Sequence, residues 1–130
     1  MTQLEQTFPI QREVGQELPV PSRWRPTIAS IVDAFCEGDF SLARGIEGAH
    51  LSNALDGAWL AQQVEGYGAT LDRLSPQAWQ TSICVWMGEW WEALIDLFTL
   101  EEGRSDLVLF LRIYQREASY DFEVSSLHVP

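Results

Sequence analysis

Two apolar runs between Trp86 and Tyr114 constrain the fold of this chain more than any other part of it. In each run every second residue is apolar, which is the side-chain period of a β-strand. The residues with this spacing are Trp91, Ala93, Ile95 and Leu97 in the first run and Leu107, Leu109, Leu111 and Ile113 in the second. A sheet face made wholly of such residues has to be buried. We therefore expect two strands that contribute one shared face to the core.

Further runs on either side extend this pattern. Residues 81–86, 90–98, 107–114 and 120–129 are rich in β-branched and aromatic residues or alternate in polarity, which is typical of strands. The links between them are short, whereas a parallel crossover needs a dozen residues or more. The sequence predicts an antiparallel meander of about four strands.

Before the predicted strands, apolar residues recur at the spacing of a helix. Pro26 suits the first turn of a helix, and Gly38 marks its end. The apolar side chains that share one face of this helix are Ile28, Ile31, Val32 and Phe35. This face is expected to pack on the sheet.

Two less regular helices follow in the pattern. Asp39 is a suitable N-cap for a short second helix, whose apolar residues would be Phe40, Ala43 and Ile46. Ser52 or Asn53 is a suitable N-cap for a third helix that runs to about Val64. Beyond it we expect a short strand at 69–71 and a single capped turn at 75–79.

Helices followed by strands indicate the α+β class, in one domain over residues 22–130. Residues 1–21 are polar and punctuated by Pro9, Pro19 and Pro21, which discourage a helix. We expect them to form an extended or partly disordered arm.

The charge of the chain excludes some classes of partner. Its formal net charge is -11, from nineteen acidic residues against eight arginines, with no lysine. Such a surface repels nucleic acid and anionic membranes and favours a basic partner, although a negative charge also simply keeps a small protein soluble. Cys36 and Cys84 lie in apolar runs, as buried free thiols do. With neither a signal peptide nor a membrane-spanning run in view, we expect a cytoplasmic protein.

The second face of the central strands is mixed in character, which is unusual for a solvated surface. It carries acidic, basic and large apolar side chains, among them Trp90, Glu92 and Asp96 on one strand and Phe110 and Arg112 on the next. Three explanations stay open: cover by the N-terminal arm, homodimerisation through the sheet, or a partner-binding site. Trp90 is the anchor we would test, since tryptophan is enriched in interfaces.

The polar segment between the two runs adds further candidates. Glu101, Glu102, Arg104 and Asp106 surround Gly103, but the spacing of oxygen ligands required for a calcium loop is missing. We expect Arg104 to pair with a neighbouring carboxylate, and Ser105 or Asp106 to hydrogen-bond backbone amides of the turn. No pattern predicts catalytic residues, a metal or another cofactor, because the two histidines are isolated.

Several segments resemble an uncharacterised family of small bacterial proteins: residues 24–26, 38–40, 67–68, 79–82 and above all Asp96-Leu-Phe-Thr-Leu-Glu-Glu-Gly-Arg-Ser-Asp-Leu107. The resemblance covers roughly residues 20–130. It implies a bacterial, single-domain, cytoplasmic protein and no particular activity. The order of helices and strands also resembles the cystatin-like cone folds of nuclear transport factor 2 relatives.

Two classes of function are compatible with these features. The first is a non-enzymatic binding protein, such as an immunity or inhibitor protein whose acidic and aromatic surface covers a basic partner, for example a nuclease toxin. The second is a small-molecule-binding protein or enzyme with a pocket between helices and sheet, and Asp96, Arg112 or Tyr114 at its mouth. An uncharacterised homo-oligomeric domain is a further alternative.

Overall fold

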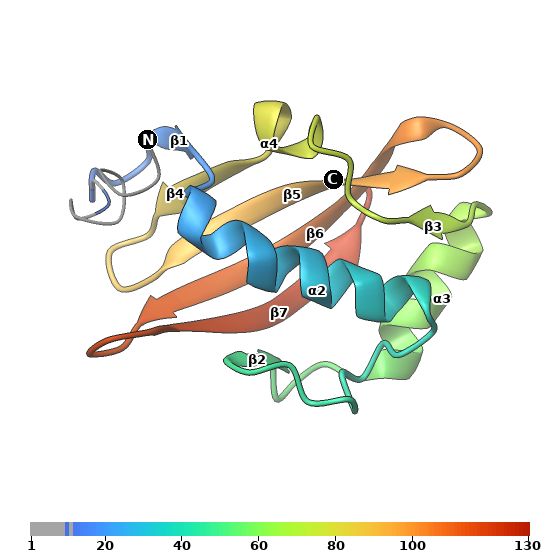
Figure 1. Ribbon diagram of the computed structural model, residues 1–130, viewed down its shortest axis with the longest axis horizontal. Coiled ribbons are helices and arrows are strands. Elements are labelled where there is room, and N and C mark those ends of the chain that lie inside the picture. Colours follow the sequence, from blue (N-terminus) through green and yellow to red (C-terminus); the bar gives the residue numbers. More distant parts are fainter. Residues whose placement is uncertain (1–9, 11) are drawn as a thin grey trace.

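The computed structural model describes residue 10 and residues 12–130; expectations about residues 1–9 and 11 lie outside the described residues. The described chain has an α+β fold, as the sequence predicts, and its sheet has seven strands. Figure 1 shows one long helix lying across this sheet, with the remaining helices near its end and edge.

The four predicted strands form the body of the sheet. They are β4 (Ile83–Trp86), β5 (Trp91–Thr99), β6 (Gly103–Gln115) and β7 (Tyr120–His128), and each pairs antiparallel with the next. The predicted meander is therefore confirmed. Its local alternation and short turns were sufficient to reveal it.

The expected sheet of about four strands was too small, and the sheet is mixed rather than antiparallel throughout. β1 (Glu17–Pro19) pairs antiparallel with β4, and β3 (Leu71–Asp72) pairs antiparallel with β5. β2 (Ala49–Leu51) pairs parallel to β7 at the other edge. Strands of two or three residues are too short to show a period, although β3 lies close to the short strand expected at 69–71.

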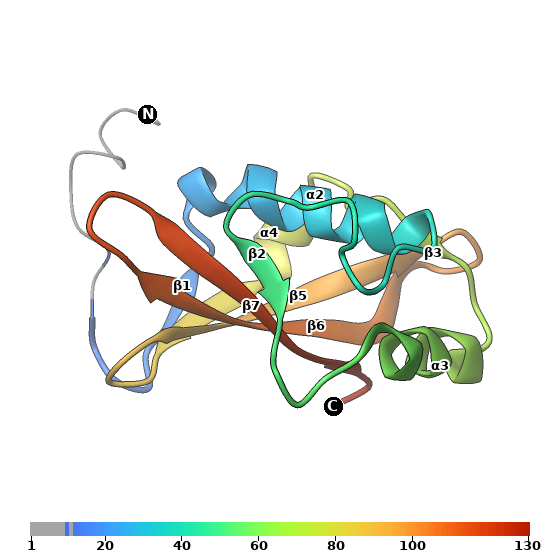
Figure 2. The ribbon, with the colours of Figure 1, turned by 90° about the horizontal axis from the view of Figure 1, so that it is seen from below.

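Helix α2 (Arg25–Cys36) confirms the first predicted helix. Pro26 lies in its first turn, where its missing N–H costs no hydrogen bond. All four residues of the predicted apolar face are buried. Figure 2 shows α2 along one face of the sheet, which identifies that face as the core side.

The prediction of a second helix is wrong: residues 37–48 form turns. Asp39 does accept backbone hydrogen bonds, from the N–H groups of Ala43 at 2.8 Å and Arg44 at 3.2 Å, as a cap would. These bonds hold the pKa of Asp39 below its usual value. However, Leu42 has a φ of 56°, a left-handed conformation that interrupts a right-handed helix.

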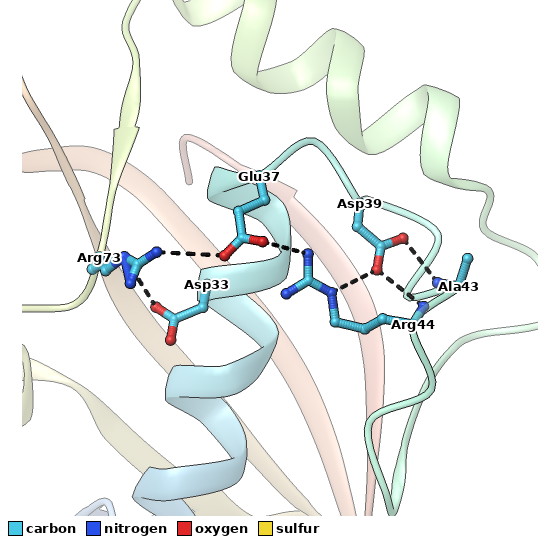
Figure 3. A network of polar contacts seen from close by, with 6 residues as sticks. All are labelled: Asp33, Glu37, Asp39, Ala43, Arg44 and Arg73. Carbon is cyan, nitrogen blue, oxygen red and sulfur yellow. Dashed lines mark hydrogen bonds and ion pairs between the residues drawn. The ribbon is translucent and has the colours of Figure 1, made fainter.

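Ion pairs attach this segment to its neighbours (Figure 3). The Arg44 guanidinium contacts Asp39 at 3.0 Å and Glu37 at 3.1 Å. Arg73 contacts Glu37 at 3.4 Å and Asp33 at 3.9 Å. The network therefore links the end of α2 to the turns after it and to the segment after β3.

Helix α3 (Gly57–Tyr67) begins later than predicted. Its N-cap is Asp56, whose carboxylate accepts the N–H of Trp59 at 2.8 Å, rather than residue 52 or 53. It ends at Gly68, whose φ of 85° suits glycine. Leu60 and Val64 are buried and attach α3 to the core.

The capped turn expected at 75–79 corresponds to helix α4 (Ala78–Thr81) and the residues before it. The Ser75 hydroxyl accepts the N–H of Gln77 at 3.3 Å and so caps the turn before α4, whereas the N-cap of α4 itself, Gln77, makes no side-chain hydrogen bond. Ala78 is fully buried, so this short helix packs at the edge of the core.

The core lies between α2 and the sheet. Every residue of the two predicted apolar faces is at most 1% exposed: Trp91, Ala93, Ile95, Leu97, Leu107, Leu109, Leu111 and Ile113. This prediction is confirmed. The likeness to cystatin-like cone folds stays a prediction.

Candidate functional site

The candidate site is the face of the sheet opposite α2, which we call the mixed face. Among the described segments, no helix covers the middle of it (Figure 2), and most of its side chains are half-buried. Its members are Ile83, Val85, Trp90, Glu92, Leu94, Asp96, Val108, Phe110, Arg112, Tyr114, Asp121, Glu123, Ser126 and His128. Alternation along the strands places most of them together, and Ser126 and His128 join them because the β6–β7 register shifts between Phe110 and Leu111.

The register of the strands arranges the mixed face in rows. One row is charged, because Arg112 on β6 is opposite Glu92 on β5 and Glu123 on β7. The next row is mainly apolar, because Leu94 is opposite both Ile83 and Phe110. The face therefore places an apolar stripe directly beside a charged one.

Arg112 lies over an aromatic side chain rather than in an ion pair. Its guanidinium is 4.9 Å from the ring centroid of Trp90, and the Trp90 and Tyr114 centroids are 6.0 Å apart. Among the described residues Arg112 forms no ion pair with Glu92 or Glu123. Stacking therefore leaves both carboxylates beside the apolar stripe without a described partner.

Two polar atoms at this centre also lack partners. Nε of Arg112 and Nε1 of Trp90 are buried, and neither has a hydrogen-bond acceptor within the described structure. Such unpaired donors cost free energy in an isolated protein. The Trp90–Arg112 pair is thus a place where a bound partner could improve the hydrogen bonding after a small rearrangement.

The row beyond the apolar one contains Asp96, Val108 and His128, and its polar members contact neighbouring residues. Asp96 accepts the Thr81 hydroxyl at 2.6 Å, and its own N–H donates to Ser82 at 3.0 Å. The ring of Phe110 stacks on His128, with centroids 4.5 Å apart and planes inclined by 9°. These contacts give the candidate residues defined positions.

The structure places the other candidates elsewhere. Glu101 and Glu102 lie in the turn between β5 and β6. Glu101 accepts the Thr70 N–H at 2.8 Å, which holds the pKa of its carboxyl below the usual value. Glu102 accepts the Tyr67 hydroxyl at 2.7 Å, and Tyr67 in turn accepts the N–H of Asp106 at 3.2 Å. These side chains attach the turn to α3 and β3, which is a structural role.

The expected ion pair of Arg104 is not found, since its exposed side chain contacts no carboxylate among the described residues. The neighbouring Glu102 and Glu101 carboxylates accept hydrogen bonds from Tyr67 and Thr70 instead.

Ser105 does bond a backbone amide, but that of Leu107 within β6 rather than one of the turn: its hydroxyl accepts the Leu107 N–H at 3.1 Å and donates to the Leu97 carbonyl at 2.8 Å. The bond to Leu97 spans an irregularity in the β5–β6 register. In the turn itself the Thr99 hydroxyl accepts the Glu102 N–H at 3.1 Å.

One cluster on this face was not found from the sequence. His50 contacts both carboxylate oxygens of Asp121 at 3.1 Å, and Arg116 contacts Asp121 at 3.3 Å. Arg116 also lies over the ring of Tyr114 at 5.1 Å, so this cluster continues into the Trp90 centre. The parallel pairing of β2 with β7 brings it together, and no spacing in the sequence indicates that pairing.

The described part of the arm runs along an edge of the sheet. Val14 forms a bridge with Trp86, and the guanidinium of Arg12 lies 4.9 Å from the Trp86 ring and 5.1 Å from the core-side Trp91 ring. This segment does not cover the mixed face. Buried side chains fill most of the space between α2 and the sheet. A pocket of about 340 Å³ lies between the start of α2 and the β7 edge, with Thr27, Tyr120 and Phe122 in its lining, so a pocket between helix and sheet stays a prediction.

Two further properties of the described residues bear on the class of protein. No helix among them is long and apolar enough to cross a membrane. No group of three or more histidine, cysteine, aspartate or glutamate side chains among them is arranged to hold a metal ion.

Together these features define a small α+β domain with one sheet face covered by a helix and the other open. The chain belongs to a family described as a domain of unknown function, DUF7668, whose model matches residues 32–130. The match begins within α2 and includes the whole mixed face. Comparison with curated proteins and with solved structures gave no match.

Proposed function

We propose that the chain is a non-enzymatic protein-binding domain that covers a basic protein partner with its mixed face, as an immunity or inhibitor protein does. The observation that carries this proposal is the open sheet face, on which half-buried aromatic and aliphatic side chains form a contiguous stripe. Exposed apolar patches of this kind are typical of interaction sites.

The chemistry of the face matches the anatomy of an interface. Trp90 and Arg112 are of the residue types that contribute most to interface energy, and they lie together near its centre. Leu94 and Phe110 supply apolar area beside them. Acidic side chains around them would attract a basic surface.

Charge favours a basic partner over a second copy. Each copy carries a formal charge of -11, so two copies repel one another as they approach. A basic partner is instead attracted, which raises the association rate and makes it dependent on salt. Homodimerisation is kept as an outcome of the experiment.

Affinity capture from the native host, with identification and purification of the captured protein, tests this proposal. We expect the captured protein to be basic. Its dissociation constant should be at least about 30-fold larger for the Trp90→Ala variant than for the wild type, because removal of a side chain that contributes about 2 kcal/mol lowers the affinity by this factor. Isothermal titration calorimetry gives this ratio.

Trp59→Ala is the matched control, because Trp59 is a partly exposed tryptophan on α3 and not on the mixed face. This variant should bind as the wild type does. Equal binding by the Trp90 and Trp59 variants would remove the mixed face from the proposal. Self-association that Trp90→Ala abolishes would replace the basic partner by a second copy.

A further inference from the structure

The edge strand β2 depends on few interactions with the rest of the sheet. It contains three residues and lies parallel to β7. Two backbone hydrogen bonds flank the pairing, from the Phe122 N–H to the Gly48 carbonyl at 2.7 Å and from the Ser52 N–H to the Val124 carbonyl at 2.9 Å. Short edge strands open easily, so a side-chain contact at this position affects how often β2 detaches.

His50, at the centre of β2, makes such a contact in a way that determines its charge. Its Nδ1 is 3.0 Å from the Leu51 carbonyl oxygen, and its Nε2 is 3.1 Å from the carboxylate oxygens of Asp121. Both neighbours are acceptors. A neutral imidazole has one N–H and satisfies one of them, whereas the imidazolium donates to both.

The charges around the ring support the cation. From β7, Asp121 contacts the ring and Glu123 is the register partner of His50, and both are acidic. From the turn between β6 and β7, Arg116 contacts Asp121 and offsets part of that negative charge. The balance of two carboxylates against one guanidinium favours a protonated ring.

We propose that protonated His50 and Asp121 form a pH-dependent clasp that holds β2 on the edge of β7. Deprotonation removes one of the two hydrogen bonds and the ion pair, and β2 then opens more often. Opening exposes the edge of β7 at residues 122–124, which is a surface for pairing with another strand. The clasp goes beyond the proposed function and does not depend on it.

The pH range follows from the direction of the pKa shift. The hydrogen bond to Asp121, followed by that to Leu51, raises the pKa of His50 above its ordinary value of 6.5. A raised pKa means that the contribution to stability is complete below the unfolded pKa. It is lost as the pH rises through the higher, folded pKa.

Amide hydrogen exchange measured by NMR tests the clasp at its own hydrogen bonds. The reporters are the Ser52 and Phe122 amides, which bridge β2 and β7, and the Ala93 amide in the core of β5 reports global opening. The pH is raised from about 5.5 to about 8.5, values that lie on either side of the range in which histidine titrates. We expect this to lower the protection factors of the two reporter amides by about 2- to 5-fold relative to that of Ala93.

His50→Gln should show no such fall, and Asp121→Asn should lower the pKa of His50 in a two-dimensional imidazole titration. His128→Gln, the matched control on the same sheet, should behave as the wild type. A pKa of His50 at or below that of an unstructured peptide would overturn the proposal. An equal pH response in the His50→Gln protein would do the same.

Discussion

Two glycines of α3 differ in whether the surrounding atoms leave space for a side chain. A Cβ on Gly57 would lie 2.7 Å from the backbone N of Ser41 and 3.0 Å from the carbonyl carbon of Phe40. A Cβ on Gly66, in the same helix, would have no heavy atom within 4 Å. The first glycine is therefore required by close backbone approach, and the second is not.

Gly57→Ala should consequently destabilise the protein by about 1 to 3 kcal/mol, the usual cost of overpacking against backbone. Gly66→Ala should leave stability unchanged or raise it by about 0.5 to 1 kcal/mol, because alanine favours the helix. Urea unfolding measures both. Equal effects of the two substitutions would contradict the close packing of α3 on the turn before it.

The Glu101 carboxylate has a predicted effect at acid pH. The Thr70 amide lowers its pKa, so its contribution to stability is present above the unfolded pKa and is lost as the pH falls through the lower, folded pKa. Glu101→Gln should therefore make unfolding stability less dependent on pH below about pH 4.5. Denaturation midpoints at several pH values show this, with Glu117→Gln in the β6–β7 turn as the control. An unchanged slope would mean that the Glu101 contact is not maintained in solution.

At the scale of elements, β6 combines a covered and an open face in consecutive residues. Leu109 is fully buried under α2, whereas Phe110 is half-buried on the mixed face and stacks on His128. The same strand thus separates residues that stabilise the fold from residues available to a partner.

Leu109→Ala should cost about 2 to 5 kcal/mol of unfolding free energy, because it leaves a cavity in the core. Phe110→Ala should cost less, about 1 to 2 kcal/mol, since its ring is only partly buried. Chemical denaturation of both variants gives the comparison. A larger loss for Phe110→Ala would indicate that the mixed face is covered within the monomer.

The elements that could be predicted from the sequence are those long enough to show the repeat of apolar residues that is typical of a helix or a strand. The helix ending at Cys36 and the long strands β5, β6 and β7 each contain enough residues to show one, and their buried faces followed from it. The second helix was wrongly predicted because a cap and three apolar residues fit a helix, whereas the backbone at Leu42 is left-handed. The pairing of β2 with β7 joins residues some 70 positions apart, and local spacing carries no information on it.

For the same reason, some residues of the candidate site could be predicted from the sequence and others could not. Alternation alone placed Trp90, Glu92, Phe110 and Arg112 on one face. The strand register reproduces this for Glu92, Phe110 and Arg112, and Trp90, just before β5, contacts Arg112 and Tyr114. The side chains of the turn at 101–106 could not be assigned from the sequence, because their partners are on α3 and beside β3. His50 was missed because its partner is on a distant strand.

At the scale of the whole molecule, the net charge of -11 should govern association kinetics more than affinity. Increasing the salt concentration from about 0.05 M to about 0.5 M should slow association with the captured partner by about tenfold or more, and should change dissociation much less. Surface plasmon resonance separates the two rates. An association rate independent of salt would exclude electrostatic attraction.

The proposed function depends on contact between a basic protein and the mixed face, in a fold whose other sheet face is covered by α2. Its most direct test is photo-cross-linking in the native host, with benzoylphenylalanine replacing Phe110 in one version of the chain and Trp59 in another. We expect a single adduct with a basic protein from position 110 and none from position 59. An adduct with a second copy of the chain, or the same adducts from both positions, would contradict the proposed function.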